Sequence, residues 1–174
     1  MRAMDIADML ISKHGRVLYL TDMKLNRLVY YVQVESIREH AGPAFPDPVE
    51  AWECGPVEPE VHRRFARFGT DRITDPSRTD ALIGGGMSKI MDMVDIVAHD
   101  YGMLASFELA GFSRRKGSAW AAAFVPGEHR RITETMIVDS DDVTEKPDPK
   151  RTLAWGADEV GRRFPNALRL LRDS

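Results

Sequence analysis

Apolar and polar residues follow helical spacing most clearly between residues 22 and 40. The apolar face of this segment consists of Leu25, Leu28, Val29 and Val32. Its charged residues lie mostly away from that face. Thr21 is suited to cap the start of a helix, and Gly42 with Pro43 would end it. The spacing therefore predicts one helix over residues 22 to about 40, with the four apolar side chains buried.

The same spacing predicts shorter helices elsewhere in the chain. They cover residues 5–13, 56 or 59 to 68, 87–101, 106–110 and 117–124. Ser106 is the expected cap of the helix that begins there. Residues 49–54 alternate with a period of two and predict a short strand, which Gly55 and Pro56 end, while residues 132–138 fit either a strand or a link. The pattern as a whole predicts a mainly α fold with short β elements.

The pattern also indicates a single compact helical domain over residues 1–145 with an appendage. The chain has 174 residues, a length that suits one domain. Residues 72–86 are polar, end in three glycines and are expected to form a mobile loop. Residues 146–174 are expected to be a linker followed by a C-terminal helical tail, because a proline-containing stretch precedes a broken amphipathic pattern over residues 152–172.

Composition narrows the partners and the compartment. Hydrophobic residues make up 43% and charged residues 29%, with a formal net charge of −3 and an isoelectric point near 6.0. This charge argues against a chain whose main task is to coat nucleic acid, since that affinity depends on many Lys and Arg side chains. No stretch approaches the roughly 18 apolar residues of a membrane span, and the first residues are acidic where a signal peptide is apolar. Cys54 has no second cysteine to pair with, which favours a reducing compartment. Together these features lead us to expect a cytoplasmic protein without membrane or nucleic-acid partners.

No constellation of residues in the sequence predicts catalysis or metal binding. The five histidines are scattered, and none pairs with another at a metal-ligand spacing. His99 and Asp100 are adjacent, and neighbouring residues on a helix do not face each other, so we expect no acid–base pair there. Residues 84–89 contain three glycines before a helix start but lack the order of a phosphate-binding loop. We therefore expect no enzyme, no cofactor and no metal.

A few residues are candidates either for architecture or for partner binding. Lys24 lies in the first turn of its helix, where a cation opposes the helix dipole, and a nearby carboxylate or a binding role would explain it. Trp52 offers a large anchoring surface and is expected to be largely buried. Gly55 and Pro56 favour a tight turn into a helix. That turn is either architectural or part of a partner-binding groove.

The basic segment Arg114-Arg115-Lys116 has two interpretations. The simpler one is a solvated surface. The alternative is a docking surface for an acidic partner, because complementary charge speeds association and selects partners.

Four segments together resemble the SocA-like Panacea antitoxin domain. They are residues 5–11, 21–31, 51–65 and 112–120, of which the third is the most specific in order and spacing. The fourth keeps Trp120 but has Ser113, Arg114 and Lys116 where the family often has a threonine, a histidine and an acid. The residues that the resemblance and the local chemistry make candidates for partner binding are Lys24, Tyr30, Trp52, Gly55, Pro56, Val57, Pro59, Arg114, Arg115, Lys116 and Trp120.

This resemblance implies a role that composition and spacing do not reveal. Members of the family resemble neutralising scaffolds and are often associated with phages or prophages. The chain is therefore expected to be antitoxin-like. Its partner would then be a cognate toxin protein encoded by an adjacent gene. Two alternatives stay open: an adaptor that presents its partner to a protease, and a phage-derived regulatory protein, among which a DNA-contacting autoregulator is the less favoured.

Overall fold

The structure is a computed structural model in which residues 1–76 and 87–148 are described. Its α-helices are α1 (Ala3–His14), α2 (Asp22–Arg38), α3 (Pro59–Phe65), α4 (Met87–Asp100), α5 (Ser106–Ser113), α6 (Ala119–Ala123) and α7 (Glu134–Val138). Two short 3₁₀ turns are η1 (Ala66–Phe68) and η2 (Asp141–Val143), and the strands are β1 (Val49–Trp52), β2 (Gly55–Val57) and β3 (Arg130–Ile132). The predicted mainly α fold with short β elements is confirmed. Most of the predicted glycine-rich loop (77–86) and of the predicted tail (149–174) lies outside the described residues.

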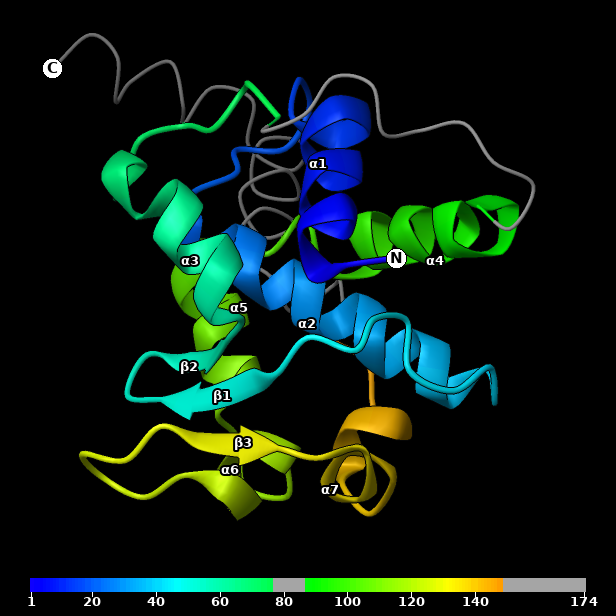
Figure 1. The fold of residues 1–174 in the computed structure, drawn as a ribbon, viewed down its shortest axis with the longest axis vertical. Helices are drawn as coiled ribbons and strands as arrows, with labels where there is room; N and C mark the ends of the chain where they lie inside the picture. The colour runs from blue at the N-terminus through cyan, green and yellow to red at the C-terminus, as the bar shows by residue number, and fades with distance from the viewer. Residues whose placement is uncertain (77–86, 149–174) are drawn as a thin grey trace, which may run out of the picture.

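Helix α2 runs through the middle of the molecule, with α1 and α4 towards one end and the small sheet, α6 and α7 at the other (Figure 1). Its predicted cap is confirmed, because the amide of Lys24 donates to the hydroxyl of Thr21 at 3.2 Å. The four apolar residues predicted to be buried are fully buried. The helix ends at Arg38 rather than near residue 40, since His40 takes a left-handed conformation with φ of 54°.

The polar face of α2 is buried as well, which its amphipathic pattern does not predict. Every residue of α2 from Lys24 to Ile37 is buried. Buried polar groups need hydrogen-bond partners, and several polar side chains of α2 find them on neighbouring loops. The side chain of Gln33, for example, donates to the carbonyl of Phe45 and accepts from the amide of Ala44 at 2.8 Å. The polar positions of α2 therefore tie the loops to the core.

The sheet has the order β2-β1-β3 with antiparallel pairing throughout. Gly55 and Pro56 do not simply end the first strand: they form β2, which pairs Trp52 with Gly55. The prediction of a strand or link over residues 132–138 was wrong for most of that segment. Thr133 accepts a hydrogen bond from the amide of Met136 at 3.2 Å and so caps α7, and this capping outweighs the strand preference of the segment's branched side chains.

The start of α5 also differs from the sequence prediction. Ala105 occupies the capping position in place of Ser106, and the carboxylate of Glu108 accepts from the Ala105 amide at 2.8 Å. An acidic side chain in the first turn of a helix can accept a hydrogen bond from the amide of the capping residue. The helix start is thereby stabilised without a capping hydroxyl from Ser106. The helix is also longer than predicted and extends to Ser113.

A buried carboxylate joins the C-terminal part of the described chain to the core. Asp142 in η2 is fully buried and accepts from the hydroxyl of Tyr30 at 2.6 Å, the guanidinium of Arg115 at 2.7 Å and the amide of Ala119 at 3.0 Å. These donors come from α2, from the segment after α5 and from α6. The three hydrogen bonds to Asp142 therefore hold η2, α2, α6 and the segment after α5 together at one buried carboxylate.

Replacing Asp142 with Ala is expected to destabilise the protein by about 3–5 kcal/mol, because the Tyr30 hydroxyl would lose its partner and the Arg115 cation would keep only the more exposed carboxylate of Glu145. Urea unfolding followed by circular dichroism measures this change. The control is Asp139→Ala, at an exposed position nearby, which should stay within about 0.5 kcal/mol of wild type. Equal stability of the two variants would show that the buried carboxylate does not anchor η2.

Candidate partner-binding groove

The glycine–proline turn of the most specific motif is part of the architecture. Gly55, Pro56 and Val57 are all buried, and Pro59 opens α3 at its first position. Gly55 has φ of +126°, and a Cβ there would lie 3.0 Å from the guanidinium of Arg27. Arg27 is itself fully buried and donates to the carbonyl oxygen of Cys54. Gly55, Pro56 and Val57 therefore offer little surface to a partner, whereas Pro59 is half-buried.

Trp52, which the sequence predicted to be largely buried, is half-buried in the structure. Side chains alternate along β1, so Val49 and Ala51 point into the core whereas Trp52 shares the half-buried face with Glu50. The indole nitrogen donates to the Glu50 carboxylate at 2.8 Å, and the ring stacks on His129 with centroids 4.4 Å apart. Trp120 is also half-buried, and its indole nitrogen donates to the carbonyl of Trp52 at 2.8 Å. The two tryptophans thus join the sheet to α6.

Lys24 and Tyr30 are internal residues of α2. The ammonium of Lys24 donates to the carbonyl of Leu104 at 2.8 Å, which links the first turn of α2 to the connection between α4 and α5. Burial lowers the pKa of Lys24, and the carboxylate of Glu108 opposes that shift. Burial and the nearby Asp142 carboxylate raise the pKa of Tyr30. The carboxylate expected near Lys24 is therefore supplied by the protein itself.

The basic segment does not form a continuous surface. Arg115 bonds to Asp142, pairs with Glu145 at 3.0 Å and lies with its guanidinium carbon 4.0 Å from the centre of the Phe112 ring. Only Arg114 and Lys116 of this segment are exposed. The interpretation of all three residues as a solvated surface was therefore wrong, because the middle cation, Arg115, is bound to Asp142 and stabilises η2.

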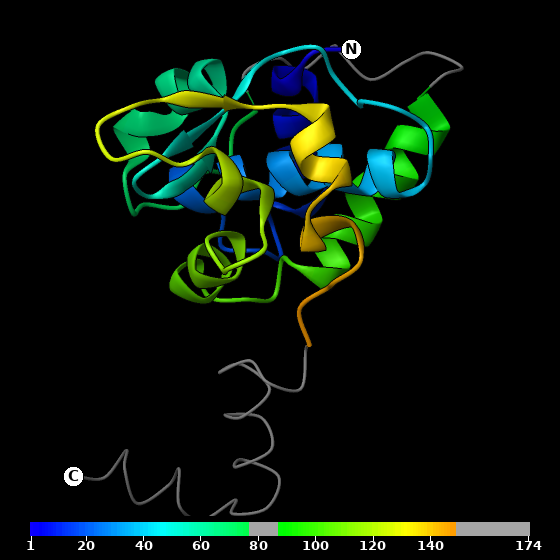
Figure 2. The ribbon, with the colours of Figure 1, turned by 90° about the horizontal axis from the view of Figure 1, so that it is seen from below.

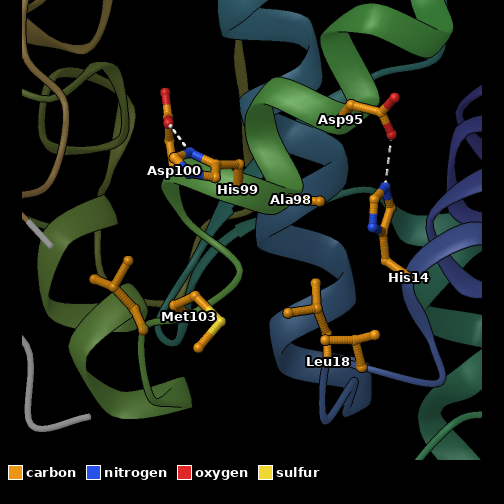
Figure 3. Close-up of a pocket in the computed structure, with 9 residues that line it drawn as sticks. His14, Leu18, Asp95, Ala98, His99, Asp100 and Met103 are labelled. Atoms are coloured by element: carbon orange, nitrogen blue, oxygen red, sulfur yellow. Dashed lines mark hydrogen bonds and ion pairs between the residues drawn. The ribbon is translucent and has the colours of Figure 1, made fainter. Parts of the chain in front are cut away.

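An open apolar groove lies instead where α1 and α4 end (Figure 3). The residues lining it are His14, Val17, Leu18, Asp95, Ala98, His99, Asp100, Met103 and Leu104. Its volume is about 380 Å³. The C-terminal parts of α1 and α4 build it together with the loops that follow them, between α1 and α2 and between α4 and α5.

Two histidine–carboxylate pairs line this groove. His14 lies 2.8 Å from Asp95, as Figure 3 shows, and Lys13 also pairs with Asp95. Burial opposes ionisation of Asp95, but the hydrogen bonds from Lys13 and His14 outweigh it and lower the pKa of this carboxyl group. His99 lies 2.8 Å from Asp100, so the expectation that these neighbours do not meet was wrong. Asp100 is the last residue of α4, where its side chain is free to turn back towards the ring.

The groove combines apolar side chains with two histidine–carboxylate pairs. Among residues 1–76 and 87–148, no hydroxyl or thiol side chain lines it. Both carboxylates are held by cations from other segments, Lys13 for Asp95 and Lys146 for Asp100. The pairs therefore fix the walls of an apolar depression.

The two loops at the groove and the first helical turns that follow them carry large exposed apolar side chains. This apolar rim consists of Val17 (80% exposed) and Met103 (58%), which line the groove, and of Tyr19 (57%), Met23 (41%) and Phe107 (63%), which follow them closely in sequence. Single exposed apolar residues are common on monomers, but a group of them beside a groove is typical of an interaction site. The bond from Lys24 to Leu104 fixes the connection between α4 and α5 on the first turn of α2, which follows the loop that carries Val17.

Sequence reasoning missed this surface, although the loops carried a signal. In both, a glycine that ends a helix, Gly15 or Gly102, is followed by a mostly apolar stretch, at residues 17–20 and 103–107. Connecting loops are usually polar, and apolar residues in them often serve function. Only the tertiary structure places the two stretches side by side.

Two further properties concern the described residues as a group. Within residues 1–76 and 87–148, no cluster of three or more His, Cys, Asp or Glu side chains could hold a metal ion. In the same part of the chain, no helix has both the length and the hydropathy needed to cross a membrane. Comparison of the chain with models of protein families, with curated proteins and with solved structures gave no match.

Replacing Gly55 with Ala is expected to destabilise the protein by roughly 2–4 kcal/mol, because φ is positive there and the new methyl group would press on Arg27. The matched control is Gly42→Ala, which also has a positive φ but has no atom within 4 Å of the new group. It should cost only about 1–2 kcal/mol. Thermal melting distinguishes the two, and an equal loss would mean that the approach of Arg27 does not constrain this turn.

Proposed function

We propose that this protein is antitoxin-like and neutralises a cognate toxin by direct protein–protein contact through the groove and its apolar rim. The observation that carries the proposal is an open apolar depression lined by the exposed Val17 and Met103, with three more exposed apolar side chains on the adjoining loop and helical turns. Complete burial of one such side chain contributes about 1.5–3 kcal/mol. A partner that covers several of them gains enough to offset the loss of rotational and translational freedom on binding.

The internal support of the rim favours a protein partner. Binding surfaces cost less to use when they do not have to order themselves first. Lys24 bonds the first turn of α2 to Leu104 in the connection between α4 and α5, and the ion pairs of Asp95 and Asp100 hold the ends of α1 and α4. A partner therefore meets a surface that is already assembled.

The resemblance to the Panacea domain supplies the kind of partner. The motif over residues 51–65 contains the end of β1, all of β2 and all of α3, so in this proposal it supports the fold rather than the contact. In this proposal the partner is the product of an adjacent, phage-linked gene, the protein acts in the cytoplasm, and it acts as a binder without a catalytic step.

Introducing a charge into the rim tests this function. Val17→Asp and Met103→Asp are each expected to weaken binding by roughly a hundredfold, since each places a carboxylate in an apolar contact. In co-expression with the neighbouring gene's product, both variants should fail to restore growth while wild type succeeds. Their melting temperatures should stay near that of wild type, because both side chains are mostly exposed.

Two control variants separate the rim from other surfaces. Val138→Asp changes an apolar residue of similar exposure (52%) on α7, and it should restore growth like wild type. Arg114→Glu with Lys116→Glu reverses the two exposed cations and spares Arg115, and it should also restore growth. Failure of this double variant alone would move the contact to the basic segment. If the neighbouring product is neither toxic nor bound, the antitoxin proposal is wrong. If the partner is degraded only when a protease is also present, the protein acts as an adaptor instead.

A further inference from the structure

We propose that residues 152–171 of this chain bind the groove and cover its apolar rim while no partner is present. The proposal rests on the proposed function in one respect: it makes the C-terminal segment a competitor of the partner for the same surface. The contact between segment and groove does not itself depend on the partner's identity. The evidence comes from where the described chain ends, from the residues that follow, and from charge.

The described chain ends beside the groove. Lys146 bonds to Asp100 at 2.8 Å, and Pro147 is buried. A second depression, lined by Pro147 and Asp148 among others, shares Leu104 with the groove. Figure 2 shows the chain reaching residue 148 on the side of the connection between α4 and α5. The segment that follows thus begins within a few residues of the rim.

The residues after Asp148 have the chemistry that an apolar groove accepts. The large apolar residues among them are Leu153, Trp155, Val160, Phe164, Leu168, Leu170 and Leu171. An extended chain covers at most about 3.3–3.6 Å per residue, so Leu153 can reach roughly 17 Å and Trp155 roughly 24 Å from Asp148. Both distances suffice to place these side chains over a groove that begins at Leu104.

Charge favours the same contact. Residues 149–174 contain six basic and three acidic residues, a net charge of +3. The remaining 18 basic and 24 acidic residues give residues 1–148 a net charge of −6. Asp92 is an exposed acid on α4, one of the two helices that line the groove. The segment and the body therefore attract each other, and added salt should weaken that attraction.

Covalent attachment makes even a weak contact effective. A short tether gives an attached segment an effective concentration in the millimolar range. A partner that needs the open groove then binds with an affinity lowered by the fraction of molecules in which the segment occupies it. The segment would thereby keep the apolar rim from nonspecific association until the partner displaces it.

Paramagnetic broadening of methionine methyl signals tests the contact in the full chain without any partner. A nitroxide is attached at Ala157→Cys in a Cys54→Ser background, and the methyl signals are assigned by single Met→Leu substitutions. Met103 and Met23 of the rim should lose most of their intensity at low protein concentration. Met136 on α7 serves as the internal control and should keep its intensity. Replacing Trp155 with Asp in the labelled protein should restore the Met103 signal.

Each other outcome overturns the proposal. Equal intensities at Met103 and Met136, or a loss that Trp155→Asp does not relieve, would show that the segment does not bind the groove. A loss that appears only at high concentration would assign the groove to the segment of a second copy. The growth assay with Val17→Asp does not depend on this result, so failure of the segment contact and failure of the proposed function are distinguishable.

Discussion

The buried carboxylate of Asp142 and its three donors form the interaction on which the arrangement of the described chain depends. Tyr30 brings α2 to this point, Arg115 brings the segment after α5, and the Ala119 amide brings α6. A carboxylate without these partners would cost several kcal/mol to bury, so all of them must be in place together. Because the donors come from elements far apart in sequence, the carboxylate selects one packing of α2 against the later helices.

Burial of α2 on all sides extends this constraint. A helix surrounded by protein needs an internal partner for each polar side chain, and Lys24, Arg27 and Gln33 find theirs on carbonyl groups of three different loops. Each bond places a loop. Arg27 positions the glycine–proline turn, whereas Lys24 positions the connection between α4 and α5. The first bond serves the fold alone, and the second also builds a wall of the groove.

The motif that is most specific in sequence and the surface that is best suited to binding therefore contact the same first turns of α2 through different side chains. Arg27 donates to the carbonyl of Cys54 in the β1–β2 turn, whereas Lys24 donates to the carbonyl of Leu104, which lines the groove. One side chain thus fixes the hairpin, and its neighbour one turn earlier fixes a wall of the groove.

Periodicity alone determined the long helix α2, the capping by Thr21 and the mainly α class, because these depend on residues close in sequence. It did not determine that Trp52 lies on the outer face, although the alternation over residues 49–52 held that information. Tertiary structure decided the burial of the polar face of α2, the structural role of Arg115 and the meeting of Val17 with Met103 around one groove. Each of these depends on a distant segment that supplies a partner or a neighbour. The pattern of apolar and polar residues along one segment does not specify which distant segment will pack against it.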